Sequence, residues 1–209
     1  MATSPYNLSE FVDDLRQITT KESEESSILK EVTPLAQRFA ADPAWRDEKY
    51  YEADEEQGFG LHLLHEEPDH TLAIFAISWL PGKGVAPHNH RTWSVVVGVD
   101  GAELNTFWKR TDDGKQPGFA AIEENTQRNI EHGEVIGMDG STIHSVINLG
   151  DQTTLSLHVY GMHLNHSGRS LFDPDTNTEE KLILKVPVSY THLRAHETDS
   201  YLVCRLLLE

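Results

Sequence analysis

The stretch from Pro81 to Gly101 constrains this chain more than any other. It begins with turn residues, reaches His88-Asn-His90, and then enters the apolar run 94–99. Successive residues of a strand point to opposite faces, so residues two apart share a face. On a strand, His88 and His90 would therefore offer two imidazoles to one centre. The stretch predicts an entry into a β-structure and part of a metal site.

A third histidine, His144, stands in another apolar run, 143–148, after the glycine-containing loop 133–140. Three convergent imidazoles form a facial site that leaves coordination positions open. Such a site suits iron(II) for chemistry with O2, but it also binds zinc, nickel or manganese. The residues alone leave the identity of the metal open.

The rest of the chain predicts short strands after two helices. Helices are expected at 8–20 and at about 24–40, where apolar residues recur at helical spacing, and Pro34 is expected to kink or break the second. The segments expected as strands are 50–53, 60–65, 70–80, 93–99, 102–110, 119–122, 129–131, 143–148 and 154–160. Short strands separated by turn residues at regular intervals fit an all-β barrel.

The two histidine segments resemble the signature motifs of the cupin superfamily, small β-barrels whose open mouth holds a metal. The matching residues are Gly82, His88, His90 and Gly101 in the first motif, and Gly133, His144 and Asn148 in the second. The resemblance implies an all-β fold, the cupin double-stranded β-helix (jelly-roll) barrel, with N-terminal α-helices. Ser94 stands where most cupins have a metal-binding glutamate. Three histidines without a carboxylate are the ligand set of thiol dioxygenases.

A second pattern strengthens that resemblance. Ser156, His158 and Tyr160 alternate along the apolar run 154–160, so a strand would place all three on one face. There a serine can orient a histidine, and the histidine a tyrosine. The pattern is similar to the Ser-His-Tyr relay of cysteine dioxygenase and mercaptopropionate dioxygenase, which implies that these three residues are catalytic. The alternative is a half-buried strand with a satisfied tyrosine.

Further residues extend or limit the match. Arg169 follows Tyr160 at a spacing that resembles bacterial mercaptopropionate dioxygenases, where such an arginine binds the substrate carboxylate through its planar fork. A solvated loop arginine is the alternative. His163 and His166, in the intervening loop, are weaker candidates for lining the mouth. Vertebrate cysteine dioxygenases carry a cysteine that cross-links to the relay tyrosine, and the corresponding position is here expected to be Val95.

The predicted organisation has three parts: residues 1–44 as a helical segment packing on the barrel, 45–187 as the cupin barrel, and 188–209 as an artefact. The last segment resembles translated sequencing-adapter DNA, and a genuine C-terminal helix is the alternative. The artefact would include Cys204, the only cysteine. We expect the natural C-terminus to have been lost after about Pro187.

The charge of the chain limits its partners. Lys and Arg number 17 against 34 Asp and Glu, a net charge of −17. Nucleic acids and anionic membrane surfaces are therefore unfavourable partners. The chain has no apolar run of about 18 residues, and its start lacks the features of a signal peptide. These features predict a cytoplasmic protein, and they do not distinguish a monomer from a homo-oligomer.

The combined prediction is an Fe(II)-dependent thiol dioxygenase that acts on a small thiol and O2. It would add O2 to the sulfur of cysteine or 3-mercaptopropionate and give a sulfinate, with His88, His90 and His144 as metal ligands. The alternative is a metal-binding cupin that acts on another small carboxylate, or a non-catalytic ligand-binding domain. An oriented phenol favours the enzyme, because a binding module has no need of one.

Overall fold

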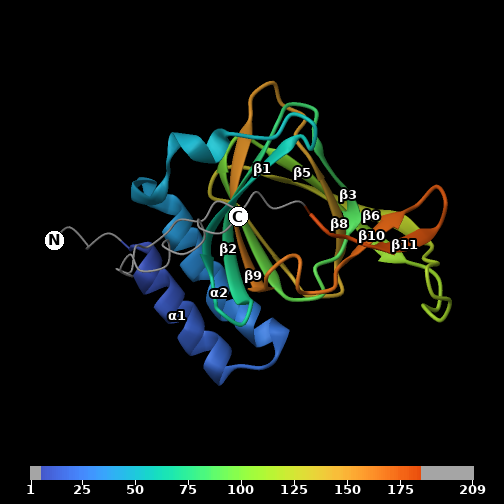
Figure 1. Ribbon diagram of the computed structural model, residues 1–209, viewed down its shortest axis with the longest axis horizontal. Coiled ribbons are helices and arrows are strands. Elements are labelled where there is room, and N and C mark those ends of the chain that lie inside the picture. Colours follow the sequence, from blue (N-terminus) through green and yellow to red (C-terminus); the bar gives the residue numbers. More distant parts are fainter. Residues whose placement is uncertain (1–5, 185–209) are drawn as a thin grey trace, which may run out of the picture.

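The computed structural model describes residues 6–184, which form two antiparallel sheets with helices on one side (Figure 1). The sheet orders are β1-β2-β9-β4-β7 and β11-β10-β3-β8-β5-β6. The strands are β1 Phe59–Glu66, β2 Thr71–Trp79, β3 Gly84–His88, β4 Ser94–Asp100, β5 Glu103–Arg110, β6 Ile122–Ile130, β7 Val135–Met138, β8 Ile143–Ile147, β9 Thr154–Met162, β10 Ser170–Asp173 and β11 Thr178–Lys181. The predicted artefact, 188–209, lies outside the described residues.

The order of the strands identifies the fold. The chain alternates between the sheets, with β2 and β4 in the first and β3 and β5 in the second. It repeats this alternation from β7 to β10. Two antiparallel sheets wound in this way form a double-stranded β-helix, the jelly-roll fold of cupins. The predicted fold class is confirmed.

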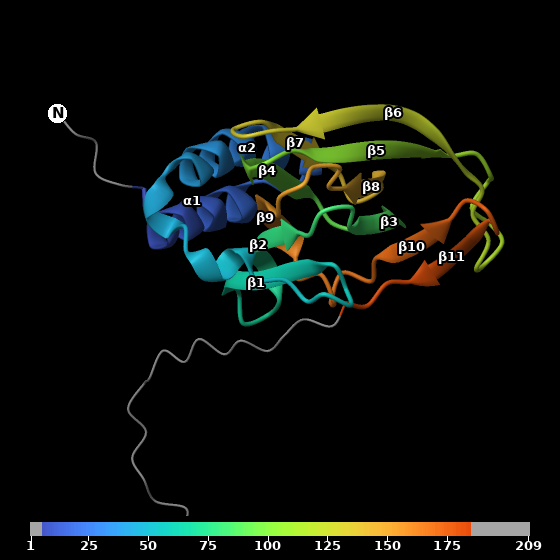
Figure 2. The same ribbon diagram turned by 90° about the horizontal axis from the view of Figure 1, so that it is seen from above.

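The two helices cover the outer face of the first sheet. Figures 1 and 2 both show α1 (Leu8–Lys21) and α2 (Glu25–Ala41) against this sheet, with the β10–β11 hairpin on the opposite side of the barrel. Asn7 caps α1, since its side chain accepts from the N–H of Glu10 and the Glu10 side chain accepts in return. Pro34 lies within a continuous α2, so no break occurs there. No helix within residues 6–184 is long and apolar enough to cross a membrane.

An apolar layer joins the helices to the sheet. Phe39 of α2 stacks on Phe11 of α1, with ring centroids 4.8 Å apart, and on Trp45, with centroids 5.5 Å apart. Val95 of β4 and Leu157 of β9 belong to the same buried cluster. This layer lies outside the barrel, and a separate apolar cluster that includes Phe75 and Val146 joins the two sheets from inside.

Several strand predictions were wrong at the edges of the sheets. The segment 50–53 is not a strand, because Glu48–Tyr51 form a short 3-10 helix, which follows another at Pro43–Trp45. β6 is one long strand where two short ones were expected, and β7 lies in an expected loop. The hairpin of β10 and β11 was not predicted. β6 is exposed along almost its whole length, so it lacks the apolar alternation on which such predictions depend.

Candidate metal centre

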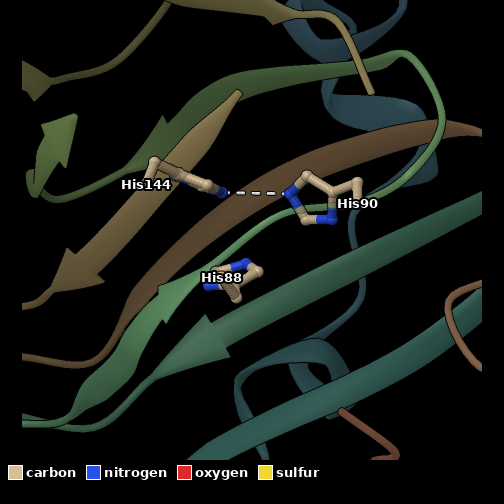
Figure 3. A group of neighbouring side chains, drawn as sticks. All are labelled: His88, His90 and His144. Atoms are coloured by element: carbon tan, nitrogen blue, oxygen red, sulfur yellow. Dashed lines mark hydrogen bonds between the residues drawn. The ribbon is translucent and has the colours of Figure 1, made fainter. Parts of the chain in front are cut away.

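Three histidines converge inside the barrel (Figure 3). His88 ends β3, His144 lies opposite it on β8, and His90 follows just after β3. Their ligand nitrogens lie within 4.8 Å of one another, and Nε2 of His90 is 3.0 Å from Nε2 of His144. The three residues are only 2% to 3% exposed. The structure thus brings together the histidines that the sequence selected.

Asn89 explains why both of its neighbours face the interior. Its backbone N–H donates to the carbonyl of Ser170, at 3.1 Å, and its side-chain Oδ1 accepts from the Ser170 N–H, at 2.9 Å. These bonds hold Asn89 against β10 and turn the flanking imidazoles the other way. The expectation that both histidines lie on the strand holds only for His88, because β3 ends there.

Two of the imidazoles are oriented by hydrogen bonds from their far nitrogens. Nδ1 of His88 lies 2.9 Å from the carbonyl of Ala86, and Nδ1 of His144 lies 3.0 Å from Oδ1 of Asn105. Each oxygen accepts the Nδ1 proton, which fixes the tautomer whose Nε2 carries a lone pair. Nδ1 of His90 is buried without a hydrogen-bond partner in the part of the chain that the structure describes.

Burial lowers the pKa of all three imidazoles, and the neighbouring charge of Arg169 lowers it further. The pKa of His144 falls to about 4. The rings are therefore neutral near neutral pH, and a neutral imidazole is the form that binds a metal. Nitrogen ligands held about 2.1 Å from one ion at a right angle would be about 3.0 Å apart, which the Nε2 separation of His90 and His144 matches. The cluster fits a transition-metal ion.

The position of the usual cupin glutamate contributes no carboxylate. Ser94 begins β4, is fully buried, and pairs with Tyr160 across the sheet. Its hydroxyl has no hydrogen-bond partner among residues 6–184. The cluster found in the same residues consists of histidines alone, so every protein ligand that it offers is neutral.

The Ser-His-Tyr pattern forms a continuous hydrogen-bonded chain on the inward face of β9. Oγ of Ser156 lies 2.9 Å from Nε2 of His158, and Nδ1 of His158 lies 2.8 Å from the hydroxyl of Tyr160. The Tyr160 ring centroid is 4.9 Å from that of His90. Burial lowers the pKa of His158 to about 3 and raises that of Tyr160. A neutral imidazole thus holds a protonated phenol beside the three histidines.

Val95 does not face the relay tyrosine. It belongs to the outer apolar cluster beneath the helices, whereas Ser94 lies directly across from Tyr160. The assignment of Val95 to the cross-link position was therefore wrong, because strand alternation sends its side chain outward. Ser94 has no thiol either, so neither residue could form a thioether cross-link to Tyr160.

Arg169 precedes β10 and is buried, at 3% exposure. Its Nε and Nη2 have no hydrogen-bond partner in the described part of the chain. Burial lowers its pKa to about 10, and its charge in turn lowers the pKa of His88, His90 and His144. Arg169 is therefore a buried cation near the histidine cluster, with one edge of its guanidinium unused.

The loop before Arg169 does not join the buried cluster. His163 is buried with its ring centroid 5.4 Å from that of Phe75, and His166 is exposed. His166 stacks on His70 with centroids 3.5 Å apart, and Nδ1 of His70 bonds Glu66 at 2.7 Å. Glu66, His70 and His166 thus form a second group of possible ligands. The stacked rings hold their lone pairs in nearly parallel planes, which suits a single ion poorly.

Sequence reasoning missed two inward residues of β5. Asn105 orients His144, and Glu103 lies deeper in the barrel with 3% of its surface exposed. The available signal was the alternation of Glu and Asn with apolar residues at the start of the expected strand 102–110. Polar residues two apart on a strand share a face, but only the pairing with β8 shows that this face is the interior.

No protein-family model matches this sequence. Solved structures of similar fold include an oxalate oxidase in complex with the substrate analogue glycolate, 18% identical, with a TM-score of 0.42 over 59% of this chain and 62% of that one. A double-stranded β-helix protein from Klebsiella pneumoniae is 12% identical, with a TM-score of 0.43 over 61% and 96% of the two chains. KdgF from Halomonas sp. is 17% identical, with a TM-score of 0.39 over 53% and 84%. The match spans less than two thirds of the oxalate oxidase.

The strand order and the histidines define the class of this protein. It is a barrel of the cupin type, with a buried group of three histidines that could bind a metal ion.

Proposed function

We propose that this protein is an iron(II)-dependent thiol dioxygenase. It would add both atoms of O2 to the sulfur of a small thiol carboxylate, cysteine or 3-mercaptopropionate, and release a sulfinate and a proton. The observation that carries the proposal is Tyr160, which ends an ordered relay with its ring 4.9 Å from that of His90, in a cluster without a carboxylate. The proposal gives Asn105, Arg169 and the Ser156-His158-Tyr160 relay a role.

Iron(II) held by His88, His90 and His144 would supply the redox chemistry with O2. Because these ligands are neutral, the site retains a net positive charge, which favours a thiolate over a thiol. Asn105 supports the site through the 3.0 Å hydrogen bond that keeps Nε2 of His144 free. Burial of the three ligands limits the access of water.

Arg169 would bind the carboxylate of the substrate. Its free nitrogens, Nε and Nη2, form one edge of the guanidinium fork and are buried. Two parallel N–H groups match the two oxygens of a carboxylate. An unpaired buried cation is costly, and an anionic substrate would offset that cost. The proposal therefore predicts a requirement for a carboxylate.

Tyr160 would donate a hydrogen bond to the oxygens as they bind to sulfur. A positioned donor stabilises the charge that develops there without reorganisation during the reaction. His158 holds the phenol at 2.8 Å, and Ser156 holds the other ring nitrogen of His158 at 2.9 Å. The relay thus sets the direction of one hydroxyl.

A second candidate function is metal-dependent chemistry on another small carboxylate. The unpaired edge of Arg169 favours it equally, since the arginine recognises the carboxylate and not the sulfur. A fold of this type hosts many reactions. The oriented phenol argues against a purely ligand-binding domain.

The test is oxygen uptake by the full chain loaded with iron(II), with cysteine, 3-mercaptopropionate and cysteamine offered in turn. Uptake with one of the two carboxylates, giving its sulfinate, is expected, whereas cysteamine should react poorly because it lacks the carboxylate. The variant Tyr160→Phe should lower kcat, and Arg169→Ala should raise KM for the carboxylate substrates only.

Matched controls separate these effects from general damage. Tyr6→Phe removes a hydroxyl that bonds Asp14 of α1, and Arg16→Ala removes an exposed arginine. Both should leave uptake unchanged. If an iron-replete protein consumes no oxygen with any of the three thiols, the second candidate replaces the first.

A further inference from the structure

The inward face of β9 is polar from Thr154 to Tyr160. Thr154, Ser156, His158 and Tyr160 occupy alternate positions, and all four are buried. Only the last three form the relay described above. The first, Thr154, points its hydroxyl at Glu103 of β5, with Oγ1 2.9 Å from Oε1. The relay therefore has an acidic neighbour at the end away from the histidines.

Glu103 is a carboxyl group that the fold leaves without a cationic partner. It is 3% exposed, and within residues 6–184 its carboxyl group accepts a hydrogen bond from the hydroxyl of Thr154 at 2.9 Å, while the Ser156 hydroxyl lies near enough to favour its ionised form. The paired residues on neighbouring strands are not titratable: Ile130 pairs with Glu103 itself, and Ile77 and Gly98 pair with Ser156. A buried unpaired carboxyl is destabilising when ionised, so a structural role explains it poorly.

Burial raises the pKa of Glu103 to about 7, while the hydroxyls of Thr154 and Ser156 favour its ionised form. The charge of Glu103 also raises the pKa of Tyr160. A carboxyl with this pKa can gain and lose a proton near neutral pH.

Thr154, although only 2% exposed, lies beside a surface hollow. It lines this hollow together with Asp100, Gly150 and Gln152, at the end of the barrel where the loops after β4 and β8 meet. Buried polar groups thus follow one another from Thr154 beside this hollow through Glu103, Ser156 and His158 to Tyr160, with contacts of 2.9 Å for Thr154–Glu103, 2.9 Å for Ser156–His158 and 2.8 Å for His158–Tyr160. Arg169 does not line this hollow.

We propose that Glu103 accepts the proton of the substrate thiol through the Ser156-His158-Tyr160 relay and releases it through Thr154 to this hollow. The inference rests on the proposed function, because the thiol must lose its proton inside a buried site. Glu103 acts through other groups, so it is a positioning and proton-holding residue.

The transfer balances without any oxidation. The S–H bond breaks, and its electron pair stays on sulfur as the thiolate. The proton adds to the hydroxyl oxygen of Tyr160, whose own proton passes to Nδ1 of His158. The Nε2 proton of His158 passes to Oγ of Ser156, and the Ser156 proton completes the carboxylic acid of Glu103. The low pKa of His158 means that these shifts occur together, without a lasting imidazolium.

The first test does not use activity. Infrared spectra of the full-length protein, recorded from about pH 5 to about pH 9, should show a protonated carboxyl that is absent from Glu103→Gln and disappears with a midpoint near 7. In D2O, the exchange of the carboxyl proton for deuterium should be slower in Thr154→Val. It should recover in Thr154→Ser, which restores the hydroxyl. Glu123→Gln, on the exposed face of β6, is the matched control. A Glu103 that is already ionised at the acidic end of this range overturns the proposal.

The second test uses the iron(II)-loaded protein. In the wild type, kcat/KM for the preferred thiol should rise with pH through about 7, as Glu103 ionises. Glu103→Gln should lose this rise and fall by at least about tenfold, with its affinity for the substrate unchanged. An identical pH profile in the variant overturns the inference while leaving the dioxygenase in place. A wild type that oxidises no thiol overturns the proposed function, and the infrared titration still decides whether Glu103 holds a proton.

Discussion

The two faces of β9 carry side chains of opposite character, apolar on the outward face and polar on the inward face. Leu155, Leu157 and Val159 point outward into the apolar layer beneath the helices. The intervening residues point inward and carry the hydrogen-bonded relay. The outward face stabilises the fold by removing apolar surface from water. The inward face buries polar groups, which contribute little to stability and are retained where function requires them.

This contrast predicts that changes on the two sides separate stability from chemistry. Outward changes should lower the free energy of unfolding and leave the metal centre intact in the molecules that remain folded. Inward changes should alter metal binding or pH dependence with smaller effects on folding. Four predictions test this division, from the largest expected effect to the smallest.

His144→Ala should abolish retention of iron(II), because it removes one of the three histidines that could hold the ion. Metal content after gel filtration measures this directly. The matched control is His166→Ala in the exposed second group, which should keep its iron. Full iron in the His144 variant would show that the centre is wrongly assigned.

Phe39→Ala should lower the free energy of unfolding by about 3 to 5 kcal/mol. Phe39 is 1% exposed and stacks between Phe11 and Trp45, so truncation leaves a cavity in the outer layer. Urea denaturation measures the loss. The folded fraction should bind iron(II) as the wild type does, and a parallel loss of iron affinity would contradict the division between the faces.

Glu103→Gln should change how stability depends on pH. Glu103 has a folded-state pKa of about 7, raised from 4.5. Its contribution to the free energy of unfolding is therefore fully present at pH values below the unfolded-state pKa. It is lost as pH rises through the folded pKa, because ionisation is then unfavourable in the barrel. As the pH rises from acidic to alkaline, the free energy of unfolding of the variant should therefore increase by about 3 kcal/mol relative to that of the wild type. Denaturation at several pH values measures this. If the free energy of unfolding depends on pH in the same way in both proteins, the pKa of Glu103 is not raised.

Asn105→Ala should weaken iron(II) binding by about tenfold to a hundredfold. The variant removes the oxygen that orients His144 while keeping all three ligands. Competition with a chelator gives the affinity. Asn129→Ala, on exposed β6, is the control and should bind iron as the wild type does. Equal affinity in both variants would mean that the strand alone positions His144.

The sequence determined the features that depend on local periodicity. Two apolar stripes at helical spacing correspond to α1 and α2, and alternation placed Ser156, His158 and Tyr160 on one face of β9. These predictions succeeded because the direction of a side chain follows from the backbone period alone. Edge strands such as β6 and β11 have no buried face to produce a pattern, and they were misjudged or missed for that reason.

Only the tertiary structure decided which faces meet. The pairing of β3 with β8 brings His88 to His144, and the pairing of β5 with β8 places Asn105 behind it. Contacts between segments distant in sequence also bury Arg169 and Glu103. The same kind of contact decides that Val95 points outward. Strand pairing is a non-local choice made by packing of the whole barrel, and a local pattern is compatible with several such choices.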